Sequence, residues 1–126
     1  MIKLIGLLGI PLLVLGLIGA VHGHPIADPG GPYTFEFGDD WVLDASASYD
    51  TEGPLMNIVY YEWALENDGK PPEWPSNSPI TVIQWYQLEQ DGVGVLGTHT
   101  IGLIVENDWG DQSDWQETTV DVVESL

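Results

Sequence analysis

The side chains of this sequence that could carry out chemistry are carboxylates, histidines and hydroxyls. Thiol chemistry is excluded, because the chain contains no cysteine. Its 20 acidic residues form many carboxylate pairs by composition alone, so no single pair is indicated for acid–base catalysis. None of the serines has the strand–turn–helix context that exposes a catalytic nucleophile. The glycine-rich segment 92–97 has the glycine spacing of a dinucleotide-binding loop, but it leads into a predicted strand and not into a helix, so it does not predict a dinucleotide site. We therefore expect a protein that is not an enzyme.

The histidines offer a different chemistry, the binding of copper. If His24 became the N-terminus after cleavage, its amine and imidazole could hold copper together with His99, as in oxidative enzymes that cleave polysaccharides. Cleavage after Gly19 would instead leave Ala20-Val21-His22, an amino-terminal chelate for copper or nickel. His99 lies on the inward-facing side of a predicted strand, so we expect it to be a structural residue.

Charge separates the start of the chain from the rest. The two basic residues are Lys3 and Lys70, and all 20 acidic residues lie after residue 24. The resulting large negative net charge of residues 24–126 repels phosphate backbones and anionic lipids, so we expect no nucleic-acid partner. An exported domain of this size often relies on disulfides. Without cysteine, this one must be stabilised by its core, by bound metal or by assembly.

The N-terminal segment is apolar from Leu4 to Val21 and follows a short positive end. With small residues at its exit, it predicts a secretory signal peptide over residues 1–23. An uncleaved membrane anchor is the alternative, because roughly 18 residues at a rise of 1.5 Å span about 27 Å. Pro11 and the glycines of the segment weaken a permanent helix. Both readings place residues 24–126 outside the cytoplasm, secreted or at the cell surface, with membrane contact only if the segment is retained.

Short segments of alternating hydrophobicity, separated by turn residues, fill the rest of the chain and predict an all-β protein. In one of them Trp41, Leu43 and Ala45 share a face. Strands are expected at 33–37, 40–46, 58–65, 80–86, 97–106 and 116–123. Residues 84–90 fit either the end of a strand or a short helical turn. The pattern is typical of an immunoglobulin-like β-sandwich of about seven strands.

Six tryptophans divide into two groups by position. Trp63 lies in the middle of a predicted strand, and Trp41 shares the face of an alternating one, so we expect both in the core. Trp74, Trp109 and Trp115 fall in loops or at outward-facing positions. Exposed aromatic side chains can stack on sugar rings or contact another protein.

Three segments, in this order and spacing, carry a resemblance to a known family. They are Ala27-Asp28-Pro29-Gly30-Gly31-Pro32-Tyr33, then Leu43-Asp44-Ala45-Ser46-Ala47-Ser48-Tyr49-Asp50-Thr51-Glu52-Gly53, and finally Gly97-Thr98-His99-Thr100-Ile101 with Asn107-Asp108-Trp109-Gly110. They are similar to the conserved segments of the PKD (polycystic kidney disease) domain of bacterial and archaeal extracellular proteins. The resemblance implies one immunoglobulin-like domain over residues 24–126, with no catalytic residues. Ala64, His99 and Asn107 depart from the family pattern.

The resemblance also implies a calcium site, because some bacterial relatives bind Ca²⁺ where these three segments meet. The matching residues here are Asp28, Asp50, Glu52, Asn107 and Asp108. Calcium takes six to eight oxygen ligands, which carboxylates, amides and carbonyls supply. The alternative is that Asp50 and Glu52 only shape a turn through hydrogen bonds to the backbone.

These observations predict a non-catalytic extracellular module that contacts a partner protein or copies of itself. The alternative is a carbohydrate-binding module that uses Trp74, Trp109 and Trp115 to bind polysaccharide. Three exposed tryptophans in one plane would favour the sugar, whereas hydrophobic edge strands would favour protein contact or assembly.

Overall fold

The computed structural model describes residues 24–125, which form nine strands, one short α-helix and one 3-10 turn. The strands are β1 (Pro25–Ile26), β2 (Tyr33–Glu36), β3 (Trp41–Asp44), β4 (Tyr49–Asp50), β5 (Ile58–Ala64), β6 (Trp74–Ser76), β7 (Ile80–Ile83), β8 (Gly97–Asn107) and β9 (Gln116–Val123). The 3-10 turn η1 is Gly53–Leu55 and the helix α3 is Trp85–Gln90. The expected signal peptide or anchor, residues 1–23, lies outside the described residues. Within residues 24–125 no helix is long and apolar enough to cross a membrane.

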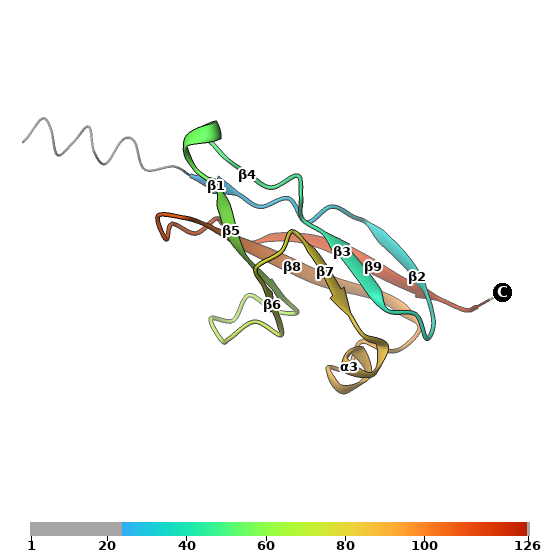
Figure 1. Cartoon of the computed structure of the whole chain (residues 1–126). Coiled ribbons are helices and arrows are strands. Elements are labelled where there is room, and N and C mark those ends of the chain that lie inside the picture. Colours follow the sequence, from blue (N-terminus) through green and yellow to red (C-terminus); the bar gives the residue numbers. More distant parts are fainter. Residues whose placement is uncertain (1–23, 126) are drawn as a thin grey trace, which may run out of the picture.

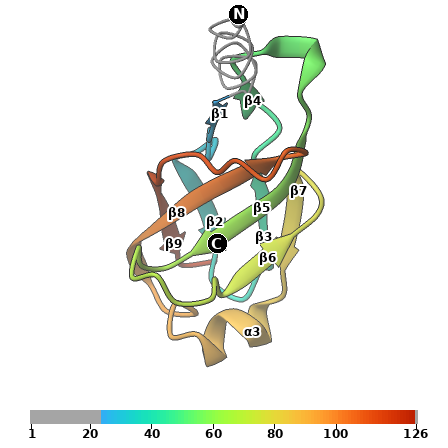
Figure 2. The same ribbon diagram turned by 90° about the vertical axis from the view of Figure 1, so that its left-hand side faces the viewer.

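The strands form two layers. A five-stranded sheet has the order β2-β9-β8-β5-β6, in which β2 and β9 are parallel and the other pairs are antiparallel. The antiparallel pair β3–β7 forms the second layer and the pair β1–β4 extends one end of the molecule. Figures 1 and 2 show β3 and β7 lying across the larger sheet, with η1 and α3 at opposite ends.

The core fills the space between the two layers. Trp41 and Leu43 of β3 are fully buried against Trp63 of β5 and against the inward-facing residues of β8 and β9. These inward-facing residues are Ile101, Leu103, Val105, Val120 and Val122. Each such aliphatic side chain stabilises the fold by about 1.5–3 kcal/mol relative to exposure. Among the described residues, every core residue lies between positions 27 and 122.

The alternating segments are found where the sequence predicts them. Trp41, Leu43 and Ala45 are completely buried, and the strand expected at 116–123 has these bounds in the structure. The strand expected at 80–86 is shorter, because α3 begins at Trp85, where the backbone N–H donates to the Asp40 carboxylate at 2.8 Å. The count of about seven strands is also low. The strands that were not expected, β1, β4 and β6, are two or three residues long, which is too short for an alternating pattern to develop.

Candidate functional site

The turn after β8 is built around a buried pair of polar side chains, Asp50 and Asn107. Only 4% of Asp50 and 1% of Asn107 is exposed. The Nδ2 of Asn107 donates to Oδ2 of Asp50 at 3.0 Å, and its Oδ1 accepts from the backbone N–H groups of Trp109 and Asp111, both at 2.9 Å. The other Asp50 oxygen accepts from the Glu52 N–H at 2.8 Å. This network joins the turn after β4 to the turn after β8, which are far apart in the sequence.

The other residues of the expected calcium set serve separate turns. Asp28 accepts a hydrogen bond from the Gly30 N–H at 3.0 Å, and Asp108 lies 3.5 Å from the amide nitrogen of Asn57. In the described part of the chain, no three histidine, cysteine, aspartate or glutamate side chains converge as metal ligands would. The structure thus brings together Asp50 and Asn107 but not the whole set, and calcium stays a prediction from the sequence.

The three tryptophans expected on the surface have different surroundings. The expectation for Trp74 is wrong: it lies in β6, is 5% exposed and belongs to the core, where its Nε1 donates to the Asp91 carboxylate at 2.7 Å. Trp115 is half-buried, and its indole covers Gly102, where a Cβ atom would collide with the ring. Trp109 is 56% exposed in the turn after β8. Of the three exposed tryptophans that would favour the alternative of sugar binding, the structure therefore leaves one exposed and one half-buried ring.

His99 contacts the core through its ring. Its Nε2 lies 2.9 Å from the Val95 carbonyl oxygen, and its ring centroid is 6.1 Å from that of Trp41. His24 is exposed, and its backbone N–H donates to the Thr51 hydroxyl at 3.1 Å. The position of His99 is consistent with the structural role expected from its inward-facing place in the strand.

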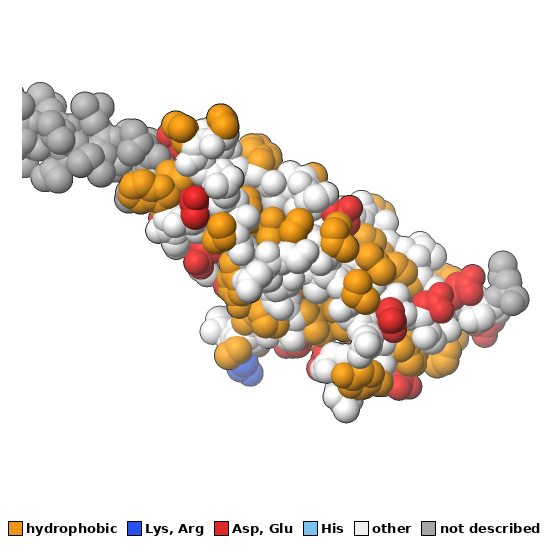
Figure 3. Space-filling model, viewed as in Figure 1, with side chains coloured by type: hydrophobic (Ala, Val, Ile, Leu, Met, Phe, Trp, Pro, Cys, Tyr) orange, Lys and Arg blue, Asp and Glu red, His pale blue; other side chains and the backbone are white. Residues whose placement is uncertain are grey.

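The outward face of the smaller sheet, β3 and β7, carries exposed apolar side chains that the sequence did not indicate. Val42 of β3 and Val82 of β7 lie directly opposite each other and are 46% and 57% exposed. Ile80 of β7, opposite Asp44, and Tyr86 of α3 extend this surface, with 42% and 58% exposure. We call these residues, Val42, Asp44, Ile80, Val82 and Tyr86, the β3–β7 face. Figure 3 shows hydrophobic side chains gathered over β3, β7 and α3, with acidic side chains at the margins.

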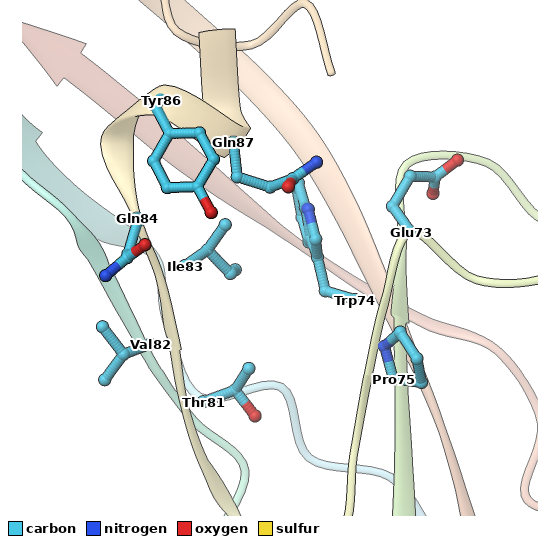
Figure 4. Close-up of a pocket in the computed structure, with 9 residues that line it drawn as sticks. All are labelled: Glu73, Trp74, Pro75, Thr81, Val82, Ile83, Gln84, Tyr86 and Gln87. Atoms are coloured by element: carbon cyan, nitrogen blue, oxygen red, sulfur yellow. The ribbon is translucent and has the colours of Figure 1, made fainter. Parts of the chain in front are cut away.

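A shallow groove of about 460 Å³ runs beside this face, between β7 and β6. One wall consists of Thr81, Val82 and Ile83 with the start of α3, and the other consists of Glu73 and Pro75 (Figure 4). Trp74 also lines the groove. The signal that could have indicated this region is the run Ile80-Thr81-Val82-Ile83, which places large apolar or β-branched side chains on both faces of one strand.

Two carboxylates approach each other on the outer surface of β5 and β8. The Nε2 of Gln112 donates to Glu62 at 3.2 Å and to Glu106 at 3.3 Å. Partial burial raises the pKa of Glu62, and the negative charge of Glu106 raises it further. The amide bridges two groups that repel each other, which indicates a structural pair.

Comparison with known proteins shows the fold. No family model matches the chain, and none of the curated proteins is similar to it. A solved structure of carbohydrate-binding modules from the β-sandwich superfamily aligns with a TM-score of 0.57 and 24% identity, over 82% of this chain and 36% of that one. Fibronectin(III)-like modules of Clostridium thermocellum CbhA align with a TM-score of 0.55 and 14% identity, over 81% and 48%.

The PKD1 domain of Vibrio anguillarum Epp aligns with a TM-score of 0.51 and 20% identity, over 81% of this chain and 96% of that domain. The chain thus spans less than half of the first two solved chains and nearly all of the third. Identities this low support the fold alone, so membership of the PKD family stays a prediction. The described residues have the fold of an immunoglobulin-like β-sandwich.

Proposed function

We propose that the domain is a non-catalytic extracellular module that binds a partner protein through the β3–β7 face. The observation that carries the proposal is the cross-strand pair of Val42 and Val82, both about half exposed, which Ile80 and Tyr86 extend. Contiguous apolar side chains that stay in water on one face mark interaction surfaces. The apolar segment at the start of the sequence supports export.

Site-specific photo-crosslinking tests this contact. A photo-crosslinking residue in place of Val42 should give a protein adduct in the cells that produce the chain. The same residue in place of Val59, which is 41% exposed on β5, serves as the matched control and should give none. The absence of a protein adduct at position 42, or equal adducts at both positions, would reject the proposal.

Polysaccharide binding is the second candidate, favoured by the exposure of Trp109 and Tyr86. The solved carbohydrate-binding modules share this β-sandwich fold. Affinity electrophoresis through gels containing a soluble polysaccharide separates the two candidates. Retardation that is lost when Trp109 is replaced by alanine would support sugar binding, and migration independent of the polysaccharide would reject it.

A further inference from the structure

The two strands that flank the groove differ in how their free edges are protected. Among the described residues, β6 pairs only with β5, and β7 pairs only with β3. β6 carries Pro75, which has no N–H and blocks the addition of another strand. β7 contains no proline, lysine or inward-pointing charge along Ile80–Ile83. β7 therefore offers an edge without these protecting features, although it is only four residues long.

The pairing register shows which backbone groups of β7 face this edge. The Ala45 N–H donates to the Pro79 carbonyl at 2.7 Å. Because hydrogen-bonded and non-hydrogen-bonded pairs alternate in an antiparallel ladder, Thr81 and Ile83 point their backbone groups toward β3. Those of Ile80 and Val82 point outward. The Ile80 N–H is taken up by the Ser78 hydroxyl at 3.2 Å, which leaves the Val82 N–H and C=O as the outward donor and acceptor at the centre of the strand.

The groove provides room beside these groups. Val82 lines it together with Thr81 and Ile83, and Pro75 lies on the opposite wall (Figure 4). Strands in a sheet lie about 4.8 Å apart, so a strand added to β7 would occupy the groove. Its alternate side chains would then continue the β3–β7 face beside Ile80 and Val82.

Charge indicates which chain would be accepted there. Asp44 lies opposite Ile80, and hydrogen bonds from Ser46 lower the pKa of its carboxyl, so it is ionised at neutral pH. Glu73 stands on the other wall of the groove. After residue 24 the sequence has one basic residue, Lys70, whose Nζ is 3.9 Å from Asp68, against 20 acidic residues. A second copy of the chain would carry the same negative charge and be repelled.

We propose that the free edge of β7 binds an extended, positively charged segment of a partner protein as an additional antiparallel or parallel strand. The proposal rests on the proposed function, since it describes how the partner would bind. Backbone hydrogen bonds to Val82 provide the attachment, and apolar side chains of the segment cover Ile80 and Val82. Its lysine or arginine side chains alternate with these, so they point to the opposite face and into the groove, where Glu73 stands on the other wall. This is strand addition, in which affinity comes from the main chain and selectivity from alternate side chains.

A short peptide that alternates lysine and valine, blocked at both ends, serves as the probe, and a peptide with glutamate in place of lysine is its control. Titration of the protein with each peptide is followed by NMR. The lysine peptide should bind and the glutamate peptide should not, and binding should weaken as salt is added. Amide hydrogen exchange of Val82 should slow on binding, whereas the Thr81 amide, already paired with β3, should be protected from the start.

Two variants separate edge pairing from contact with the face. Val82→Pro removes the outward N–H but keeps an apolar ring at an edge position that tolerates proline. It should weaken peptide binding by about tenfold, the loss expected for one or two hydrogen bonds. Val42→Thr makes the face more polar and leaves the β7 edge intact. Because Val42 lies on β3, on the far side of β7 from the free edge, affinity should change by less than about twofold if the peptide pairs with that edge.

The outcomes distinguish the two proposals. Protection of the Val82 amide, together with the loss in Val82→Pro, supports strand addition. If the peptide binds without protecting that amide, or if it does not bind while photo-crosslinking at position 42 yields a protein adduct, strand addition is rejected and the protein-binding face stands. Equal binding of both peptides would also reject the selection for positive charge.

Discussion

The Asn107 side chain holds the turn after β8 to the turn after β4, and its replacement by alanine tests that role. Its amide donates to Asp50 and accepts from the N–H groups of Trp109 and Asp111. The side chain is 1% exposed, so water cannot take over these contacts without opening the turn.

The expected loss follows from the hydrogen bonds that disappear. Each of the three contributes about 1 kcal/mol net, and the Asp50 oxygen left without its donor adds about 1–3 kcal/mol. Asn107→Ala should therefore lower the free energy of unfolding by about 4–6 kcal/mol, out of the total of about 5–15 kcal/mol typical of a small domain. For a domain of about 100 residues this lowers the Tm by about 15 °C or more.

Urea and thermal unfolding, followed by tryptophan fluorescence, measure this loss. Asn57→Ala is the matched control, because the Asn57 side chain is exposed and makes a single contact of 3.5 Å, with Asp108. It should change the free energy of unfolding by less than about 0.5 kcal/mol, as surface substitutions usually do. If Asn107→Ala were no less stable than Asn57→Ala, the assignment of Asn107 as the structural link would be refuted.

Three further predictions concern other parts of the sandwich. Gly102→Ala forces the Trp115 indole away from β8, and should lower the Tm and shift the tryptophan emission toward that of a more exposed ring; an unchanged spectrum would contradict this packing. Glu62 has a pKa raised above 4.5 in the folded protein, so the native state binds the extra proton and its stability falls as pH rises through the interval above 4.5. Glu62→Gln should gain stability over the wild type as pH increases from 4.5 to neutral, measured by urea unfolding, and a constant difference would reject the assignment. Millimolar Ca²⁺ at tenfold excess over Kd should raise the free energy of unfolding by about 1.4 kcal/mol and so raise the Tm more than Mg²⁺ does, and Asp50→Asn should abolish the rise; equal effects of the two ions would remove the calcium hypothesis and leave the bond between Asp50 and Asn107 as the role of that pair.

The parts of the fold that could be predicted are those where one sheet face is buried over several residues. Trp41 and Leu43 alternate with exposed neighbours, so their period of two is visible in the sequence. β6 could not be recognised, since it is three residues long and includes Pro75. The burial of Trp74 depends on Asp91, which lies 17 residues further along the chain and accepts the indole hydrogen bond. A local pattern contains no information about that distant partner.

The candidate surface was missed for a related reason. A run such as Ile80-Thr81-Val82-Ile83 is typical of a strand buried on both sides, but the structure buries only Ile83 and leaves Val82 exposed. Whether the second face is covered depends on whether another element lies over it, and this is a property of the topology. In the case of Asn107, the sequence indicated a turn position, but only the three-dimensional arrangement shows that its amide donates to Asp50.

The negative charge of the domain and the open edge of β7 belong to one physical argument. An exposed edge strand with apolar side chains promotes association between identical chains, yet each copy carries 20 carboxylates, so approach of a second copy is opposed by repulsion. That repulsion extends over about 10 Å at 0.1 M salt and only about 3 Å at 1 M. The same charge attracts a basic segment, whose backbone would satisfy the outward groups of Val82. Charge therefore selects which segment binds, and the β7 edge provides the backbone hydrogen bonds that hold it. Salt dependence measures the first contribution and protection of the Val82 amide the second, so both have to be measured on the same complex.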